Sequence, residues 1–302
     1  MGKSAHKSNL VGVARVDILI TGANGLLGIH AVSRLAEEHQ VHAVVHSLPA
    51  EPLPNVLYYE VDLSGTWAPG TLPEKIDAVV HLAQSSRFRE FPEQAMDVFG
   101  VNVASTARLL EYARSAGARH FILASSGGVY GAGDEAFREN SPIPHHGQLG
   151  YYLGSKLCAE VLAENYSSLM NVAILRFFFM YGRGQKRQML VPRLIDNVIA
   201  GNAITLQGED GIKINPIHVS DAVAALEGCL KLEGSHTFNV AGTQTLSLRE
   251  IACTIGEAVG REPVFKIDSN EPRHLIADIG VLSEVLVVPK VCFAQGILEL
   301  VP

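Results

Sequence analysis

Ile18-Leu19-Ile20-Thr21-Gly22-Ala23-Asn24-Gly25-Leu26-Leu27-Gly28 is the stretch that decides the fold of this chain. Apolar residues lead into a glycine-rich turn, and a helical pattern follows at once. Such a strand–turn–helix directs free backbone N–H groups and the positive end of the helix dipole at one point, which suits a pyrophosphate. Gly22 allows a tight turn, Gly25 allows close approach of the phosphates, and Gly28 allows the helix to pack against its strand. By itself, the spacing also fits a strand–turn–helix that binds no ligand.

The composition excludes several classes of protein. Of the 302 residues, 47% are hydrophobic and 18% are charged, and the mean hydropathy is +0.18. These values are typical of an enzyme with a large core. The net charge of -7 argues against a general binder of nucleic acid or of anionic membranes. Because the apolar runs are too short to span a bilayer, we expect a cytoplasmic protein without nucleic-acid or membrane partners.

The cysteines give no sign of a disulfide framework or a metal site. Four are present, at positions 158, 229, 253 and 292, and they are scattered without a C-x-x-C pair. All lie in apolar or helical surroundings. We therefore expect buried free thiols and no bound metal.

Strands and helices alternate as far as residue 182. After the opening strand, we expect further strands at 41–46, 56–61, 76–83, 119–124 and 172–177, and helices at 26–39, 92–116 and 151–169. The continuous apolar run in 76–83 is typical of a strand that is covered on both faces. This alternation of five or six strands with helices predicts an α/β fold with a Rossmann-type, doubly wound parallel sheet.

The pattern changes after Gly182, where the elements become shorter and mixed. We expect a dinucleotide-binding domain formed by residues 15–182 and 216–258. A smaller, discontinuous C-terminal substrate-binding domain would comprise 183–215 and 259–302, and residues 1–14 would be a flexible tail. The smaller domain should pack over the carboxyl edge of the sheet, where ligands bind in open α/β folds.

The sequence leaves more than one role possible for three polar residues near the expected dinucleotide site. His46 ends the second strand, where an acidic residue would bind the ribose 2′-hydroxyl and an arginine would accept a 2′-phosphate. Since neither is present, the choice between NAD and NADP stays open. Asp62 follows the third strand and could either accept a bond from adenine or cap a turn. Asn102 either ties its helix to the sheet or touches the site, and we favour the tie.

Tyr152 and Lys156 stand one helical turn apart, so their side chains share a face. Tyrosine is a poor base because its ordinary pKa is about 10, but a nearby ammonium lowers that value. Tyr152 could then take a proton from a substrate alcohol while a nicotinamide accepts a hydride. Ser126, at the end of the fifth strand, could bind the same oxygen. The alternative for Tyr152 is an exposed tyrosine on a helix.

Together, the motifs resemble those of the extended short-chain dehydrogenase/reductases. More narrowly, they are similar to the NAD-dependent epimerase/dehydratases that act on nucleotide sugars. The resemblance covers nearly the whole chain from about Arg15. The motifs, in order, are Thr21-Gly-Ala-Asn-Gly-Leu-Leu-Gly28, His81-Leu-Ala83, Ser126 with Val129-Tyr130-Gly131, Tyr152-x-x-x-Lys156, Arg176 through Tyr181-Gly182, and Ile217-His218-Val219-Ser220-Asp221.

The resemblance implies roles for individual residues and assembly with a second copy of this chain. Ser126, Tyr152 and Lys156 would be catalytic. Asp62 and Leu63 would meet the adenine, and the segment after the fourth strand would line the nicotinamide. The expected NAD-binding residues, with NADP not excluded, are Gly22, Asn24, Gly25, Leu26, Leu27, Gly28, His46, Asp62, Leu63, Leu82, Ala83, Gln84, Ser86, Asn102, Tyr152, Lys156 and Phe178. The family also implies a homodimer formed through the helices at 92–116 and 151–169.

Departures from the family pattern narrow the reaction. The 4,6-dehydratases carry Asp-Glu, or at least Glu, after the catalytic Ser or Thr, whereas this chain has Gly127-Gly128. Dehydration is therefore disfavoured, and 4-epimerisation of a nucleotide sugar is the leading hypothesis. The alternatives are reduction of a 4-keto-sugar, a dehydrogenase or reductase for another carbonyl, and a non-catalytic NADP-sensing protein.

Two further departures affect substrate binding. Phe179 stands where the family often has Asn, and Ile214-Asn215-Pro216 replaces Arg-Asp-Phe. Basic residues nearby could hold a nucleotide diphosphate instead, or they could form a solvated loop. The substrate-binding residues that we expect are Ser126, Phe179, Arg183, Arg187 and Arg193.

Overall fold

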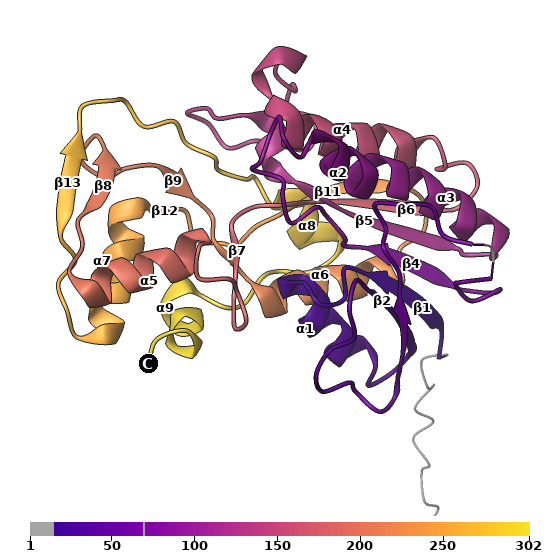
Figure 1. The fold of residues 1–302 in the computed structure, drawn as a ribbon. Coiled ribbons are helices and arrows are strands. Elements are labelled where there is room, and N and C mark those ends of the chain that lie inside the picture. Colours follow the sequence, from indigo (N-terminus) through magenta and orange to yellow (C-terminus); the bar gives the residue numbers. More distant parts are fainter. Residues whose placement is uncertain (1–14, 69) are drawn as a thin grey trace, which may run out of the picture.

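A seven-stranded parallel sheet forms the centre of the computed structural model, which describes residues 15–68 and 70–302 (Figure 1). The predicted tail, 1–14, lies outside the described residues. The strand order is β11-β6-β5-β4-β1-β2-β3, and every neighbouring pair is parallel. The strands are β1 (Asp17–Thr21), β2 (Gln40–Val45), β3 (Val56–Glu60), β4 (Ala78–His81), β5 (His120–Ser126), β6 (Asn171–Phe177) and β11 (His236–Val240).

This order confirms the predicted doubly wound sheet and adds one strand to the expected number. From β1 the chain runs outward through β2 and β3, and it then crosses to β4 on the other side of β1. The order therefore reverses between β1 and β4, which is where open α/β sheets bind ligands. The seventh strand, β11, pairs with β6 at the far edge.

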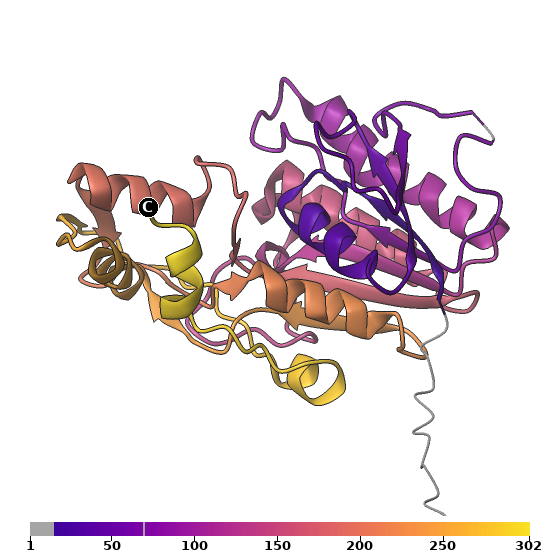
Figure 2. The same ribbon diagram turned by 90° about the horizontal axis from the view of Figure 1, so that it is seen from below.

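Helices cover both faces of the sheet, as Figures 1 and 2 show. On one face, α1 (Leu26–Leu35) and α6 (Val219–Cys229) pack against Ile18 and Ile20. On the other face, α3 (Ser105–Ser115) and α4 (Gly150–Glu164) pack against Leu19. Since successive residues of a strand point to opposite faces, the short apolar run of β1 contributes to both cores.

The predicted helix at 92–116 consists of three pieces. It begins as α2 (Ala95–Phe99), continues as the π-helical η1 (Gly100–Ala104), and ends as α3. At the start of this wide turn the backbone of Gly100 lies very close to that of Ser64. A Cβ on Gly100 would lie 2.8 Å from the Ser64 carbonyl oxygen. π-Helical turns are rare and often occur at functional sites, and this one contains Asn102.

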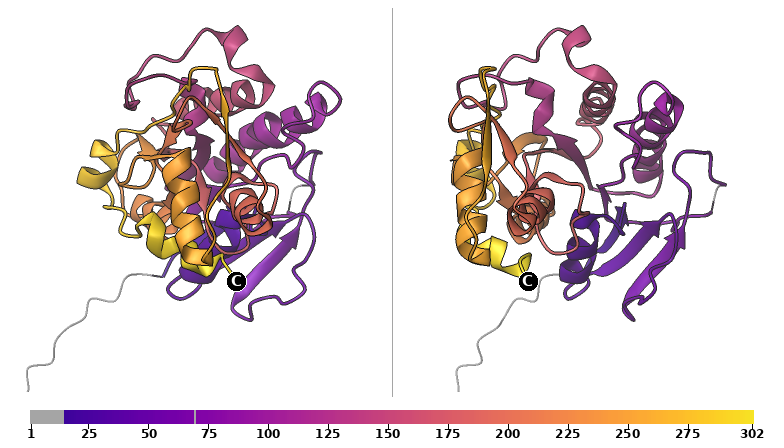
Figure 3. Two further views of the ribbon diagram at one scale, coloured as in Figure 1. Left: turned by 90° about the vertical axis from the view of Figure 1, so that its left-hand side faces the viewer. Right: turned by 60° about the vertical axis from the view of Figure 1, so that its left-hand side comes forward.

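A smaller unit lies beside the sheet layers and has its own core (Figure 3). There, α5 (Leu190–Ala200) packs against α7 (Leu248–Val259), and α9 (Phe293–Gly296) and η4 (Ile297–Glu299) join them. β8 (Ile204–Gln207) pairs with β13 (Phe265–Asp268), and β9 (Lys213–Ile214) with β12 (Leu246–Ser247). The chain enters from β6 through β7 (Met180–Tyr181), which pairs with β10 (Ile217–His218).

The packing of two helices differs from the predicted domain boundaries. α7 belongs to the core of the smaller unit, although 248–258 was predicted with the sheet. α8 (Gly280–Val285) packs on β11, although 280–285 was predicted with the smaller domain. A capping box starts α7: the Ser247 side chain accepts from Glu250 N, and Glu250 accepts from Ser247 N. The division into a dinucleotide and a substrate domain stays a prediction.

The cysteines differ in their exposure. All four are free thiols, as expected, but Cys158 and Cys253 are exposed rather than buried, because they lie on the outer faces of α4 and α7. Cys229 is buried, and burial raises its pKa to about 12. In the described part of the chain, no helix has the length and apolar character needed to cross a membrane, and no group of three or more metal-ligating side chains is arranged around a common point.

The glycine turn depends on very close backbone contacts. Gly22 has φ +68°, and a Cβ there would lie 2.7 Å from Ala83 N. A Cβ on Gly28 would lie 2.2 Å from the Gly22 carbonyl oxygen. These contacts bring the first turn of α1 directly onto the end of β1, which agrees with the close packing predicted for Gly28.

Gly28→Ala should destabilise the protein by about 1–3 kcal/mol, because the added methyl forces the turn away from α1. Gly154→Ala in α4 is the matched control: no atom lies within 4 Å of its Cβ position, so alanine should stabilise the helix by up to about 1 kcal/mol. Urea unfolding measures both. Equal stability of the two variants would contradict the packing described here.

Candidate active site

The start of α1 has the features of an anion-binding turn. Gly25 is the N-cap residue and has no side chain with which to cap the helix. Its own N–H donates to the Gly22 carbonyl over 2.9 Å. The N–H groups of Leu26, Leu27 and Gly28 belong to the first helical turn, where no intrahelical acceptor exists. This turn holds no acidic residue. The predicted pyrophosphate-binding residues therefore fit such a ligand.

A buried hydrogen-bonded chain fixes this turn to its neighbours. The Thr21 hydroxyl and His81 Nδ1 are 2.7 Å apart, and His81 Nε2 is 3.0 Å from the Thr106 hydroxyl. Thr106 donates to the Asn102 carbonyl, and Ala83 N donates to Thr21 Oγ1. One tautomer satisfies all four bonds: His81 donates from Nε2 and accepts at Nδ1. Burial, and then the charge of Lys156, lowers the pKa of His81 to about 3, so the ring is neutral.

The predicted adenosine side gathers residues that follow β1, β2 and β3. Asn24 Nδ2 donates to the Ser47 carbonyl over 2.7 Å, and His46 is exposed beside it. Asp62 accepts a bond from Ser64 N at 2.9 Å, so it caps a turn. Hydrogen bonds from Ser64 lower the pKa of Asp62, and His46 contributes to the same shift. Asp62 is exposed and Leu63 is buried.

Asn102 ties its helix to two other elements. Its Oδ1 accepts from Ser85 N, and its Nδ2 donates to the Ser155 hydroxyl, both over 2.9 Å. The side chain is almost completely buried. These bonds join η1 to the segment after β4 and to α4, as favoured from the sequence. A contact between Asn102 and a cofactor stays a prediction.

Ser126 and Tyr152 come together at the carboxyl edge of the sheet. The Tyr152 hydroxyl donates to Gln84 Oε1 over 3.0 Å, and the tyrosine ring packs against Phe88 with the ring centres 4.8 Å apart. Burial raises the pKa of Tyr152 to about 12, although a hydrogen bond with Ser126 and the charge of Arg89 act in the opposite direction. The hydroxyl is therefore protonated at neutral pH in this structure.

Lys156 plays a different part from the one predicted. Its ammonium donates to the Ala124 carbonyl over 3.0 Å, and it is not among the groups that lower the pKa of Tyr152. The predicted effect of Lys156 on the tyrosine pKa stays a prediction for the cofactor-bound protein. Burial lowers the pKa of Lys156 itself to about 8, against the attraction of Glu160. The ammonium is thus mostly charged at neutral pH.

The two glycines after Ser126 are enclosed by apolar side chains. A Cβ on Gly127 would lie 2.3 Å from the Phe178 ring, and one on Gly128 would lie 2.9 Å from Leu153. Phe178 is buried and packs with Tyr130. Its ring fills the space that a side chain at position 127 would need, and Leu153 fills that at position 128, so the structure gives Phe178 a core role. Contact between Phe178 and a cofactor stays a prediction.

The other residues predicted to line the nicotinamide lie in the segment after β4. Leu82 and Ala83 are half-buried, and Ala83 lies against the glycine turn. Gln84 contacts Tyr152 directly, whereas Ser86 is exposed.

The residues predicted to bind substrate are more dispersed. Phe179 has φ +33° and is the only non-glycine residue with positive φ in the described part of the chain. Arg187 pairs with Asp196. Arg183 and Arg193 are exposed, and the Arg183 carbonyl contacts His30 of α1 at 2.8 Å. Within the described residues, none of the three arginines contacts the Ser126–Tyr152–Lys156 group.

Sequence reasoning missed Phe88, Arg89 and Glu160. Phe88 and Arg89 follow the fourth strand in a loop with no recognisable spacing, so nothing in the sequence marked them. Glu160 carried a usable signal, because Tyr152, Lys156 and Glu160 are spaced by four and share one helix face.

A model of the NAD dependent epimerase/dehydratase family matches residues 18–241. The chain belongs to this family. It is therefore an enzyme of NAD-dependent type, as predicted. The chain is 28% identical to an uncharacterized UDP-glucose epimerase of Bacillus subtilis over 89% of this chain and 91% of the relative. It is 26% identical to a dTDP-4-dehydro-6-deoxy-D-allose reductase of a Streptomyces species over 89% and 90%.

The fold of this epimerase/dehydratase also matches solved structures. MoeE5 in complex with UDP-glucose and NAD is 30% identical, with a TM-score of 0.78 over 93% of this chain and 95% of that one. MoeE5 with UDP-glucuronic acid and NAD gives a TM-score of 0.79.

Gly127→Ala should destabilise the protein by about 1–3 kcal/mol, because the methyl meets the Phe178 ring. The double variant Gly127→Ala/Phe178→Leu should be less destabilised than the sum of the single changes by about 0.5–3 kcal/mol, measured by urea unfolding. Gly65→Ala, whose Cβ meets no atom within 4 Å, should combine additively with Phe178→Leu. If Phe178→Leu combined additively with Gly127→Ala as well as with Gly65→Ala, the contact between Gly127 and Phe178 would be contradicted.

Proposed function

We propose that this protein is an NAD-dependent 4-epimerase of a nucleotide sugar, with UDP-glucose or UDP-glucuronic acid as the first substrates to test. The observation that carries the proposal is the Ser126–Tyr152 pair beside Gly127-Gly128, where Phe178 and Leu153 fill the places of an acidic pair. The site thus offers proton transfer at one hydroxyl and no acid for eliminating water. Family membership and the UDP-sugars bound by MoeE5 support this choice.

In the proposed mechanism, the glycine turn would hold NAD, which would supply the hydride chemistry: removal of a hydride from the sugar carbon and its return to the other face. Tyr152 accepts the proton of the 4-hydroxyl and later gives it back. Ser126 donates a hydrogen bond to the developing carbonyl oxygen. The high pKa of Tyr152 means that the tyrosine becomes a base only when positive charge is added beside it. We propose oxidised nicotinamide as the source of that added charge, alongside Lys156, which is already charged.

Reduction of a 4-keto-sugar is the second candidate function. The Streptomyces reductase supports it, because the same three side chains could serve a single reduction. The two functions differ in cofactor turnover. An epimerase should show NADH absorbance only after a UDP-sugar is added and should consume no external cofactor, whereas a reductase should consume added NADPH or NADH steadily.

We also assign proposed binding roles to the remaining predicted residues. Gly22, Gly25 and the first turn of α1 would hold the pyrophosphate, and the residues that follow β2 and β3 would meet the adenosine. Arg183, beside α1, would contact the substrate diphosphate, whereas Arg187 would first have to release Asp196. The smaller unit would close over the sugar.

A homodimer is proposed as the assembled form. Met96 and Phe99 on α2 and Val161 on α4 are large apolar side chains that are 75%, 44% and 52% exposed. Phe91 stacks on Tyr151 beside them, with ring centres 4.9 Å apart. Exposed apolar side chains on neighbouring helices are typical of a protein–protein interface.

Tyr152→Phe should lower turnover by about 10²–10⁴-fold, because the change removes the proton-transfer group and keeps the ring. Binding of NAD should be preserved. Epimerisation of UDP-glucose and UDP-glucuronic acid, followed by product analysis, measures the first effect, and calorimetry measures the second. Tyr166→Phe, at the end of the same helical region, should retain full activity. Normal turnover by Tyr152→Phe would exclude the proposed mechanism.

Met96→Glu/Val161→Glu should shift a dimer to monomers at micromolar concentration, because it places charges at the centre of the apolar surface. Sedimentation velocity measures the change. Leu298→Glu, at a residue that is 60% exposed on η4, should leave the assembly unchanged. If the Met96→Glu/Val161→Glu variant remained a dimer, the interface would have to lie on another surface.

A further inference from the structure

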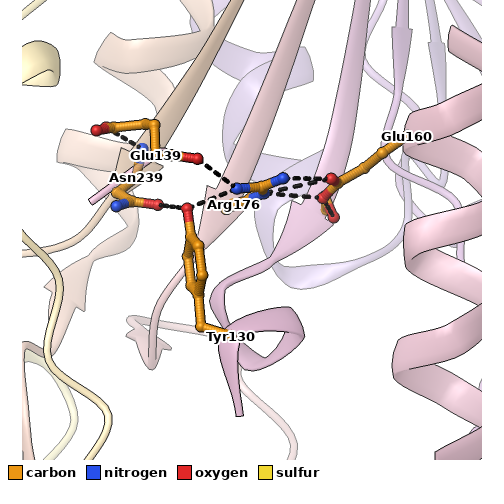
Figure 4. Close-up of polar contacts among 6 residues, drawn as sticks. Tyr130, Glu139, Glu160, Arg176 and Asn239 are labelled. Carbon is orange, nitrogen blue, oxygen red and sulfur yellow. Dashed lines mark hydrogen bonds and ion pairs between the residues drawn. The ribbon is translucent and has the colours of Figure 1, made fainter. Parts of the chain in front are cut away.

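A buried ion pair joins α4 to β6 (Figure 4). Glu160 on α4 faces Arg176 on β6, with Arg176 Nη2 2.7 Å from Glu160 Oε2 and Nε 3.1 Å from Oε1. The side chains are only 2% and 8% exposed. The Ser125 hydroxyl also donates to Glu160 Oε1. The carboxylate is therefore fully engaged, which is the condition for keeping a charge in the interior.

The ion pair is coupled to the site through β5. Lys156 bonds the carbonyl of Ala124, and Glu160, one turn later on α4, bonds the side chain of Ser125. Two consecutive residues of β5 are thus held by one face of α4, and the next residue is Ser126. Since Tyr152 lies one turn before Lys156, these bonds set the position of Ser126 relative to Tyr152.

The other side of the network reaches the loop that contains Glu139, between β5 and α4. Arg176 Nη1 donates to the Tyr130 hydroxyl over 2.6 Å and to the Glu139 carbonyl over 3.1 Å. The Tyr130 hydroxyl donates to Asn239 Oδ1, and Asn239 N donates to the Glu139 carboxylate. Figure 4 shows Arg176 at the centre, with Glu160 on one side and Tyr130 and Glu139 on the other. Arg176 therefore joins β6, α4, β11 and this loop.

Glu160 is also the anion that faces Lys156 within the described residues. From β4, His81 faces Lys156 as a neutral ring. From β5, the contact is the Ala124 carbonyl, and from β6, Arg176 lies beyond Glu160. Tyr152, on the same helix, is protonated. Burial lowers the pKa of Lys156 and Glu160 raises it, so the charge of Glu160 opposes the loss of the lysine proton.

We propose that Glu160 and Arg176 are positioning residues, which keep Lys156 protonated at neutral pH and hold Ser126 in place against Tyr152. Glu160 supplies the charge, and Arg176 supplies the counter-charge that allows a carboxylate to stay ionised in the interior. The inference rests on the catalytic role proposed for Lys156.

Two variants separate charge from shape. Glu160→Gln removes the charge and keeps the size and a hydrogen-bond acceptor for Ser125. Arg176→Lys keeps the charge and breaks the two-pronged contact. With UDP-glucose as substrate, the alkaline limb of the kcat–pH profile should move to lower pH by about one unit or more in Glu160→Gln, and it should stay in place in Arg176→Lys. If the two residues had a purely structural role, kcat would fall in both variants and the alkaline limb of each variant would stay where it is in the unmodified enzyme.

The pair Glu160→Gln/Arg176→Met guards against misfolding, because it leaves no unpaired buried charge. Its alkaline limb should move as in Glu160→Gln, while its stability exceeds that of the single Glu160→Gln variant. If its limb coincides with that of the unmodified enzyme, the inference is overturned.

Urea unfolding without substrate or cofactor gives an independent readout. The folded pKa of Lys156, about 8, lies below its value of about 10.4 in the unfolded chain. Between these values the unfolded chain binds the extra proton, so the Lys156 contribution makes the unfolding free energy rise with pH. This rise should begin at lower pH in Glu160→Gln and should be absent in Lys156→Met.

The outcomes distinguish this inference from the proposed function. Normal turnover by Lys156→Met would remove the catalytic role on which the inference rests. If Lys156→Met and Tyr152→Phe are inactive but Glu160→Gln shows an unshifted limb and an unshifted rise in stability, the proposed function stands and the role of Glu160 is refuted.

Discussion

The contact between the end of β1 and the end of β4 is the constraint on which the site depends. Gly22 lies so close to Ala83 that no side chain fits between them, and the neutral His81 joins Thr21 to Thr106 across the same junction. This contact fixes the glycine turn, the start of α1 and the segment after β4 as one body. Gln84, which meets the Tyr152 hydroxyl, lies in that segment. The dinucleotide turn and the proposed catalytic residues therefore share one rigid support.

Burial has opposite consequences for the two titratable groups at this support. It raises the pKa of Tyr152 and lowers that of Lys156, because each group is driven toward its neutral form. The free enzyme is thus not a ready base. In the catalytic role proposed above, its tyrosine would gain that ability only when positive charge accumulates nearby, as on binding of the oxidised cofactor.

The sequence predicted those parts of the structure that depend on local pattern. The strand–turn–helix at 18–28 and the apolar strands were found because a short stretch determines each of them. The pKa of Tyr152 could not be predicted, since it depends on neighbours from several elements. The role of Phe178 beneath Gly127 was also hidden, because it joins the ends of two strands that are 51 residues apart in the chain. α7 and α8 were assigned to the wrong cores for the same reason: amphipathicity shows that a helix is packed but does not show against what.

The π-helical turn at Gly100–Ala104 changes the helical phase along one continuous segment. Met96 and Leu110 are fourteen positions apart, which is about four turns of a regular α-helix, so an unbroken helix would place both on one stripe. Instead, Met96 is 75% exposed and Leu110 is 0% exposed. The wider turn rotates α2 relative to α3, so that Leu109 and Leu110 of α3 lie in the core, whereas Met96 and Phe99 of α2 face outward and only Val98 of that helix is buried. A single residue inserted into or deleted from this turn during evolution would therefore exchange an inward face for an outward one.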